Sequence, residues 1–162
     1  SVAALRGVLN QWADEPVNFI NAPVMAEDMG LRFREAREAD GGSYTTLIEV
    51  VAETDDGEHV VAGTLFNGDD LRLVRVDEYD LETVPEGEML FYRNIDRPGM
   101  LARVGSLLAD ADINIGALAL GRKGRGEMAL TAVNVDDTIP DAVLDEIAAL
   151  DGVEGVRAVH VQ

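Results

Sequence analysis

The stretch MLFYRNIDRPGML, residues 89–101, decides the fold. It opens with the apolar run Met89–Tyr92, continues through the polar segment Asn94–Gly99, and passes at Met100 into apolar residues at helical spacing. A strand is therefore expected to end in a polar loop that opens a helix. The N–H groups of the first helical turn attract a carboxylate, and Asp96 beside them accepts from an ammonium group. This loop therefore suits a free amino acid.

The residues that follow extend this unit. The predicted elements are a strand (89–93), a helix (98–110), a strand (113–120), a turn (121–126), a strand (128–135), a helix (140–150) and a strand (153–161). This βαββαβ order predicts a ferredoxin-like fold. Asp137 and Thr138 are expected to cap the second helix.

The preceding half has a different pattern. Its predicted elements are helices over Val2–Trp12 and Pro23–Met29, the latter ended by Gly30, a strand from Leu31 to Arg34, and three antiparallel strands over Thr46–Thr54, Glu58–Phe66 and Leu71–Val74. Helices followed by an antiparallel sheet predict a small α+β unit. A polar linker at Pro85 divides the chain into predicted domains at 1–85 and 86–162.

Composition excludes several classes of site. The chain has 162 residues and no cysteine, which excludes disulfides, thiolate metal sites and thiol nucleophiles. The two histidines, His59 and His160, lie too far apart to form a metal-binding motif, so no metal is expected. No apolar run approaches the roughly 20 residues that cross a bilayer, and we expect a cytoplasmic protein.

The net charge of −18 disfavours nucleic acid and anionic membranes as partners. Carboxylates are dispersed through every segment, and Lys123 is the sole lysine. This composition resembles the proteomes of salt-adapted archaea, where high internal salt screens the self-repulsion.

The loop at Asp96–Gly99, the strand start Ile113–Ile115 and the βαββαβ order together resemble an ACT domain, an amino-acid-sensing module. The upstream half resembles the intervening domain of long-form D-3-phosphoglycerate dehydrogenases. The segments that carry this second resemblance are Glu15–Pro23, Val61–Phe66, Val74–Asp77 and Val84–Gly87.

The resemblance implies a regulatory region behind an NAD-dependent dehydrogenase that makes serine from 3-phosphoglycerate. No G-x-G-x-x-G loop is present, so no cofactor is expected in this chain and NAD would bind only in the parent enzyme. The match begins inside the intervening domain, after its opening strand, and we expect the chain to be part of a longer protein. The catalytic domains of that parent are expected partners.

The family's effector site transfers to this sequence residue by residue. It implies L-serine, or another small amino acid, bound between paired ACT domains of a homo-oligomer. The implied residues are Asn94, Asp96, Pro98, Gly99 and Met100 from one copy and Asn114 from the other. Asn94 departs from the family, which often has His or Tyr there. The alternative is that Asp96 caps its helix and Asn114 satisfies a turn.

Arginines on predicted strands form a second candidate group, suited to a phosphate or polycarboxylate: Arg32, Arg34, Arg37, Arg72 and Arg75. We favour the alternative that they pair with neighbouring carboxylates. The basic residues of the predicted turn, Arg122, Lys123 and Arg125, are interpreted as solvated. The alternative, implied by the family resemblance, is that they contribute to the interface with the first domain.

Three functional hypotheses remain. Serine feedback through a dimer is favoured. An assembly module without an effector is the second, and a regulatory subunit of another amino-acid enzyme, such as an iron-sulfur serine dehydratase, is the third. A free-standing enzyme is disfavoured, because no nucleophile and base form a recognisable arrangement.

Overall fold

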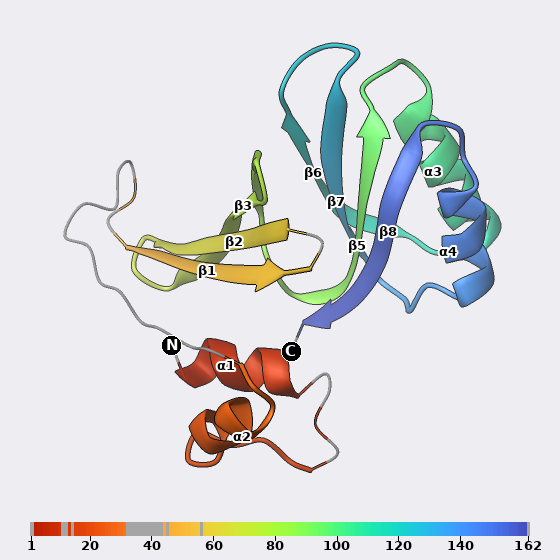
Figure 1. Cartoon of the computed structure of the whole chain (residues 1–162). Coiled ribbons are helices and arrows are strands. Elements are labelled where there is room, and N and C mark those ends of the chain that lie inside the picture. Colours follow the sequence, from red (N-terminus) through yellow and green to blue (C-terminus); the bar gives the residue numbers. More distant parts are fainter. Residues whose placement is uncertain are drawn as a thin grey trace. The chain divides into compact units, whose positions relative to one another are not determined.

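Figure 1 shows the computed structural model, which describes residues 2–10, 13, 15–31, 44, 46–55 and 57–161. The chain divides into two compact units, Ser1–Gly42 and Ser43–Gln162. The domain boundary expected at residues 85–86 falls inside the second unit, between two sheets, and stays a prediction. No helix in the described ranges is long and apolar enough to cross a bilayer.

The described residues of the first unit form two short helices, α1 (Val2–Leu9) and α2 (Ala22–Asp28). Gly30, at φ 74°, follows α2 in the left-handed conformation that commonly ends helices. The predicted Trp12 and the strand residues after Leu31 lie outside the described residues. The core of this unit consists of Leu5, Leu9, Val17, Ala22 and Ala26.

The first sheet of the second unit has four antiparallel strands in the order β1-β2-β3-β4: β1 (Leu47–Thr54), β2 (Gly57–Phe66), β3 (Asp70–Val76) and β4 (Tyr79–Thr83). The sequence predicted only three strands, so β4 is a correction. Asp77 turns the chain at φ 49°, and its N–H and carboxylate bond to Val60, which fixes the β3–β4 turn.

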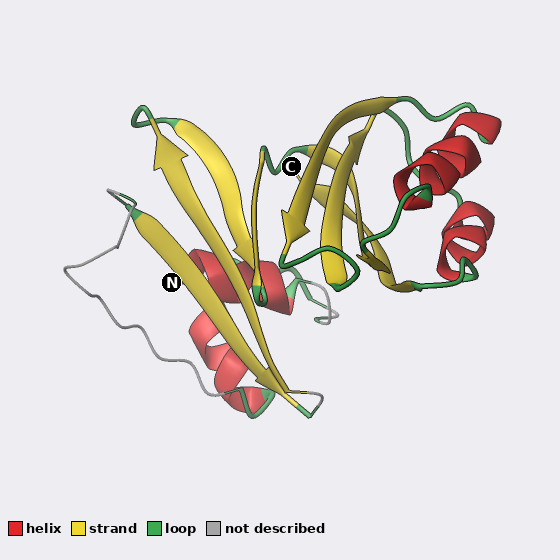
Figure 2. Cartoon of the chain, turned by 90° about the horizontal axis from the view of Figure 1, so that it is seen from above, coloured by secondary structure: helices red, strands yellow, loops and turns green. Residues whose placement is uncertain are grey.

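The second sheet confirms the predicted βαββαβ order. Its elements are β5 (Gly87–Ile95), α3 (Met100–Asp110), β6 (Ile115–Arg122), β7 (Met128–Val135), α4 (Asp141–Ala148) and β8 (Val153–Val161). The strands are antiparallel neighbours in the order β6-β7-β5-β8, and both helices cover one face, which gives the predicted ferredoxin-like α+β fold (Figures 1 and 2). Between helices and sheet lies a core that includes Leu90, Tyr92, Val104, Leu108, Val133 and Ile147.

The predicted cap of α4 is wrong. Pro140 is the N-cap residue, and no side chain bonds to the first turn. The helix begins at Asp141 with Pro140 as its N-cap, so Thr138 lies two residues too early to cap it, and its hydroxyl donates to Glu88 at 3.3 Å.

The face of the second sheet opposite the helices receives β4. Tyr79 and Leu81 pack against Ala119, Leu130 and Ala132. This contact joins the two sheets within one unit.

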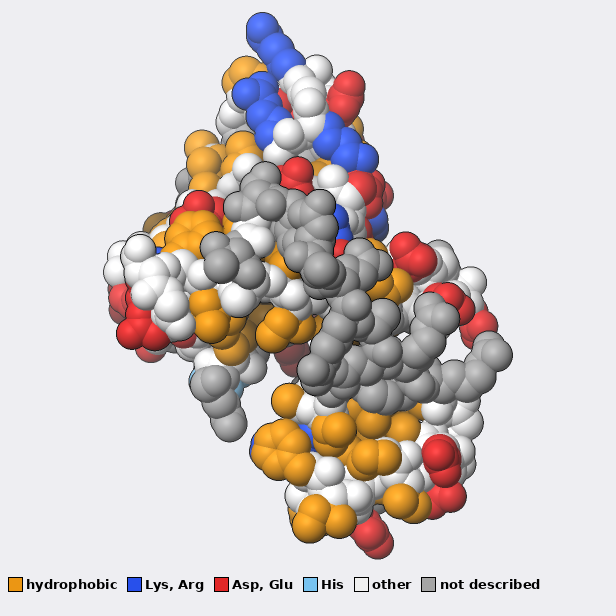
Figure 3. All heavy atoms as spheres, turned by 90° about the vertical axis from the view of Figure 1, so that its left-hand side faces the viewer, with side chains coloured by type: hydrophobic (Ala, Val, Ile, Leu, Met, Phe, Trp, Pro, Cys, Tyr) orange, Lys and Arg blue, Asp and Glu red, His pale blue; other side chains and the backbone are white. Residues whose placement is uncertain are grey.

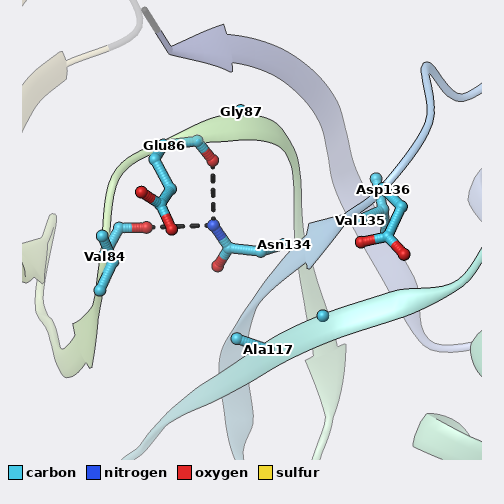
Figure 4. Close-up of a pocket in the computed structure, with 8 residues that line it drawn as sticks. Val84, Glu86, Gly87, Ala117, Asn134, Val135 and Asp136 are labelled. Atoms are coloured by element: carbon cyan, nitrogen blue, oxygen red, sulfur yellow. Dashed lines mark hydrogen bonds between the residues drawn. The ribbon is translucent and has the colours of Figure 1, made fainter.

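The segment after β4 is held by a side chain of β7. The Asn134 amide donates to the carbonyls of Val84 (3.0 Å) and Glu86 (3.1 Å), as Figure 4 shows. The Asn134 side-chain oxygen accepts from the Thr83 hydroxyl. These bonds fix where the chain enters β5.

Candidate functional site

The β5–α3 loop is held by backbone bonds to the end of the β6–β7 loop. The Asp96 N–H donates to the Glu127 carbonyl at 2.8 Å, and the Gly126 N–H donates to the Asp96 carbonyl at 3.0 Å. Gly99 follows at φ 90°, a left-handed conformation that a side chain would strain, and Met100 begins α3. The loop therefore has a defined position relative to the β6–β7 loop.

Asp96 pairs with a residue that the sequence did not connect to it. The Arg122 Nε donates to Asp96 Oδ2 at 2.5 Å, and the Asp96 side chain is only 18% exposed. Asp96 makes no capping bond to α3, since no side chain of the described residues caps that N-terminus. Arg122, predicted as a solvated turn residue, is the last residue of β6; its side chain is 51% exposed, and its guanidinium also forms this ion pair.

The other basic residues of the β6–β7 loop differ from Arg122. Lys123 lies 3.3 Å from a Glu78 carboxylate oxygen and above the Tyr79 ring. Arg125 is exposed. Figure 3 shows Lys and Arg side chains gathered at the top of the view, where this loop lies.

Asn94 lies inside the domain rather than at its surface. Its side chain is on the helix-covered face of β5, its Oδ1 accepts from Thr131 at 3.0 Å, and its Nδ2 donates to the Ile95 carbonyl. The buried Tyr92 hydroxyl makes no hydrogen bond to the described residues, and burial raises the pKa of Tyr92. Asn94 thus stabilises the start of the loop from inside the domain, and its side-chain oxygen and nitrogen each already have one partner.

The remaining predicted loop residues flank the start of α3. Met100 is buried beside Pro98 and Gly99, and its N–H makes a long bond of 3.4 Å to the Arg97 carbonyl. Arg97 Nη2 donates to the carbonyl and the carboxylate of Asp151 at 2.6 and 2.7 Å. That hydrogen bond, with the charge of Arg97, holds the pKa of Asp151 below its usual value.

Asn114 lies at the opposite end of the sheet from Asp96. It precedes Ile115, which pairs with Val135 at the far end of β7, whereas Ile95 pairs with Met128 at the near end. At about 3.4 Å per residue, the eight-residue strand β7 separates the two ends by about 24 Å. One chain therefore does not bring Asp96 and Asn114 together.

The Asn114 amide is oriented by a carboxylate. Its Nδ2 donates to Asp136 Oδ2 at 2.8 Å, while its carbonyl receives the Asp136 N–H. The sequence reasoning did not identify Asp136, and only the register of β6 on β7 shows the pair.

Strand β6 forms an edge of the second sheet and carries exposed apolar side chains. Ile115, Leu118 and Leu120 are 38%, 39% and 44% exposed, and Leu101 of α3 is 50% exposed. An edge strand with unpaired backbone groups and apolar side chains is suited to pairing with another strand.

A shallow hollow of about 530 Å³ lies near Asn114, between the linker and β6 (Figure 4). It is lined by Val84, Glu86, Gly87, Gly116, Ala117, Asn134, Val135 and Asp136. Its lining contains two carboxylates and no basic side chain, so it offers no charged partner to a ligand carboxylate. The hollow is therefore a poor match for a zwitterion.

Of the candidate anion-binding arginines, the structure describes Arg72 and Arg75, whereas Arg32, Arg34 and Arg37 lie outside the described residues. Arg75 forms an ion pair with Glu49 of β1, and Arg72 Nε lies 3.9 Å from Glu82 of β4. Because β3 is bulged against β2, both arginines share a face with the buried Ala62 and Thr64. The two arginines have carboxylate neighbours, and an anion there stays a prediction.

Comparison with known families divides the chain into the same two parts as its motifs. Residues 1–77 match the D-3-phosphoglycerate dehydrogenase intervening domain, and residues 89–152 match the ACT domain. The chain therefore carries the D-3-phosphoglycerate dehydrogenase intervening domain followed by an ACT domain, a kind of module that binds amino acids and dimerises.

Relatives named D-3-phosphoglycerate dehydrogenase match nearly the whole chain. Those of Synechocystis sp., Archaeoglobus fulgidus and Methanocaldococcus jannaschii are 35%, 32% and 29% identical over 99%, 99% and 98% of this chain. The chain spans only 29–30% of the length of these relatives. A homoserine dehydrogenase structure from Thiobacillus denitrificans matches 47% of this chain at 26% identity, and the match covers 17% of the homoserine dehydrogenase chain. Its TM-score is 0.38, which is too low to establish a shared fold.

Proposed function

We propose that the chain is the effector-sensing region of an NAD-dependent D-3-phosphoglycerate dehydrogenase, and that two ACT domains bind L-serine between them. Bound serine inhibits the parent enzyme by feedback. In this proposal the protein is cytoplasmic, and the NAD site and the catalytic residues belong to other domains of the parent. The observation that supports the proposal is that Asp96 and Asn114 lie near opposite ends of the edge strand β6.

Two-fold pairing explains how separated residues act together. If β6 pairs antiparallel with β6 of a second copy, the start of one strand lies beside the end of the other. Asn114 of one copy then approaches Asp96 of its partner. The exposed side chains Leu118 and Leu120 are buried along the same seam, which supplies a driving force for pairing.

The groups at this seam match a zwitterion. Asp96 accepts from an ammonium, the first-turn N–H groups of α3 face a carboxylate, and the Asn114 oxygen accepts from a hydroxyl or ammonium. Serine then acts as an allosteric inhibitor if it binds one arrangement of the dimer more tightly than another. A coupling free energy of about 1–3 kcal/mol is enough.

Calorimetric titration of L-serine into the purified chain tests the proposal. We expect Asp96→Asn to weaken binding about tenfold or more, because a charge-assisted bond of about 1.5–3 kcal/mol is lost. Asp112→Asn is the matched control: it removes the same charge from an exposed residue at φ 60°, a conformation that Asn tolerates. Equal serine affinity of the Asp96→Asn and Asp112→Asn variants contradicts the role of Asp96.

The second candidate function is an assembly module without an effector. The Asp96–Arg122 pair favours it, since the proposed ammonium acceptor already has a cationic partner. Sedimentation with and without L-serine separates the two functions. A dimer that forms through β6 and takes up no amino acid supports the assembly module.

A further inference from the structure

The Asp96–Arg122 pair has unused bonding capacity on both sides. Only Nε of Arg122 and Oδ2 of Asp96 form the bond, and the second carboxylate oxygen and both guanidinium amino groups make no other hydrogen bond within the described part of the chain. A ligand ammonium can bind the free Asp96 carboxylate oxygen, and a ligand carboxylate can bind the two guanidinium amino groups of Arg122. The pair as a whole is neutral and dipolar, as an amino acid is.

The register of the sheet places Arg122 next to the proposed ligand site. Register places Asn94 of β5, Ala129 of β7 and Arg122 of β6 in one row across the sheet, so Arg122 is on the same face as Asn94 and beside the start of α3. The row ends at the proposed edge of the dimer. A ligand at Asp96 therefore has Arg122 as its neighbour.

Contacts on both sides of Arg122 fix its backbone. A Cβ on Gly121 would lie 2.9 Å from Tyr79 Cβ and 3.0 Å from the Asp80 carbonyl oxygen, so β6 approaches β4 closely there. Lys123 is bound to Glu78 on the other side. Because its backbone is anchored and its guanidinium is already bound to Asp96, Arg122 loses little conformational freedom when it takes up a second partner.

Arg122 also offsets the electrostatic repulsion between this acidic chain and a ligand carboxylate. The chain carries a net charge of −18, which repels any carboxylate-bearing ligand. The N–H groups of one helix start carry only partial charge, whereas Arg122 supplies a full positive charge beside the ammonium acceptor.

We propose that Arg122 binds the carboxylate of the amino-acid effector while Asp96 binds its ammonium, so that one ion pair recognises both ends of the zwitterion. This inference rests on the proposed effector function. It makes Arg122 a specificity residue that selects amino acids over amines of the same shape.

The test compares L-serine with ethanolamine, which is serine without its carboxylate, by calorimetry on the whole chain. We expect Arg122→Gln to weaken L-serine binding about tenfold or more, towards the ethanolamine level, and to leave ethanolamine binding unchanged. Arg122→Lys keeps the charge without the planar fork and is expected to recover part of the serine affinity. Arg125→Gln, in the adjoining β6–β7 loop, is the matched control and is expected to bind both compounds like the wild type.

Three results would contradict the inference. L-serine binding to Arg122→Gln that equals or exceeds wild type overturns the inference, because Arg122 is then only a competing counter-ion of Asp96. An equal loss in Arg125→Gln reduces the effect to general charge and also overturns it. A wild-type chain that binds neither compound contradicts the proposed function, and the inference falls with it. Circular dichroism of each variant excludes unfolding as the cause of lost binding.

Discussion

The two sheets of the second unit differ in how they bury their apolar side chains. The second sheet (β5–β8) has a core under its own helices, where Leu90, Leu108 and Ile147 are each 0% exposed. The first sheet (β1–β4) leaves Ile48 69% exposed and Leu71 50% exposed. We infer that the ACT half is stable by its own packing, whereas the first sheet depends strongly on the contact of β4 with the second sheet.

Truncating one side chain in each sheet gives the largest expected contrast. Leu108→Ala removes a fully buried side chain from the helix-covered core and is expected to lower the free energy of unfolding by about 2–5 kcal/mol. Ile48→Ala, at an exposed position, is expected to change it by less than about 0.5 kcal/mol. Urea unfolding followed by circular dichroism measures both. Similar losses at the two positions contradict the difference between the sheets.

Loosening the contact between the sheets is expected to have the next largest effect. Gly121→Ala places a Cβ 3.0 Å from the Asp80 carbonyl oxygen, which is backbone and yields little, so we expect a loss of about 1–3 kcal/mol. Hydrogen exchange is expected to accelerate in β4 more than in β5. Gly105→Ala in α3 is the control: its Cβ meets nothing within 4 Å, and we expect a gain of about 0.5–1 kcal/mol. Unchanged exchange in β4 of Gly121→Ala argues against the contact.

Removing the Asn134 amide, which holds the segment between β4 and β5, is a second test of the contact between the two sheets. Asn134→Ala leaves the Val84 and Glu86 carbonyls and the Thr83 hydroxyl without this partner. A loss of about 1–2 kcal/mol is expected, because each hydrogen bond contributes about 0.5–1.5 kcal/mol and water reaches part of the hollow. Thermal unfolding measures the loss, with the exposed Asn10→Ala as control. Equal thermal stability of Asn134→Ala and Asn10→Ala would show that the Asn134 hydrogen bonds do not stabilise the fold.

The smallest expected effect concerns the surface of the second sheet. Arg97 lowers the pKa of Asp151, so the pair stabilises the folded chain above the ordinary Asp pKa of about 4, and this stabilisation is lost as pH falls through the lowered pKa. Arg97→Gln is expected to return the pKa of Asp151 to its usual range, measured by NMR titration of the carboxyl carbon. Stability at pH 7 is expected to change little, since the carboxylate is fully exposed. A large loss at pH 7 would mean that ion pairs, rather than the core, stabilise this sheet.

The sequence was sufficient for the βαββαβ half, because its apolar periodicity changes clearly between strands and helices. It missed β4, a five-residue strand separated from β3 by a turn in which Asp77, rather than glycine, adopts positive φ. The loop at Asp96 was recognisable as a polar strand-to-helix connection. Its partner Arg122 was not, since β6 is bulged between Ile115 and Ala117 and the bulge shifts the register, so counting residues does not show which end or face Arg122 reaches.

The separation of Asp96 from Asn114 within one chain is the central claim, because it requires a serine site shared between two copies. Mixing the Asp96→Ala and Asn114→Ala chains, after dissociation and reassociation, and titrating L-serine by calorimetry tests it most directly. Each variant alone is expected to bind poorly, whereas random pairing makes half of the dimers mixed, each with one intact site, and restores about a quarter of the wild-type sites. Full binding by either variant alone, or no binding restored in a mixture shown to contain mixed dimers, would contradict the account.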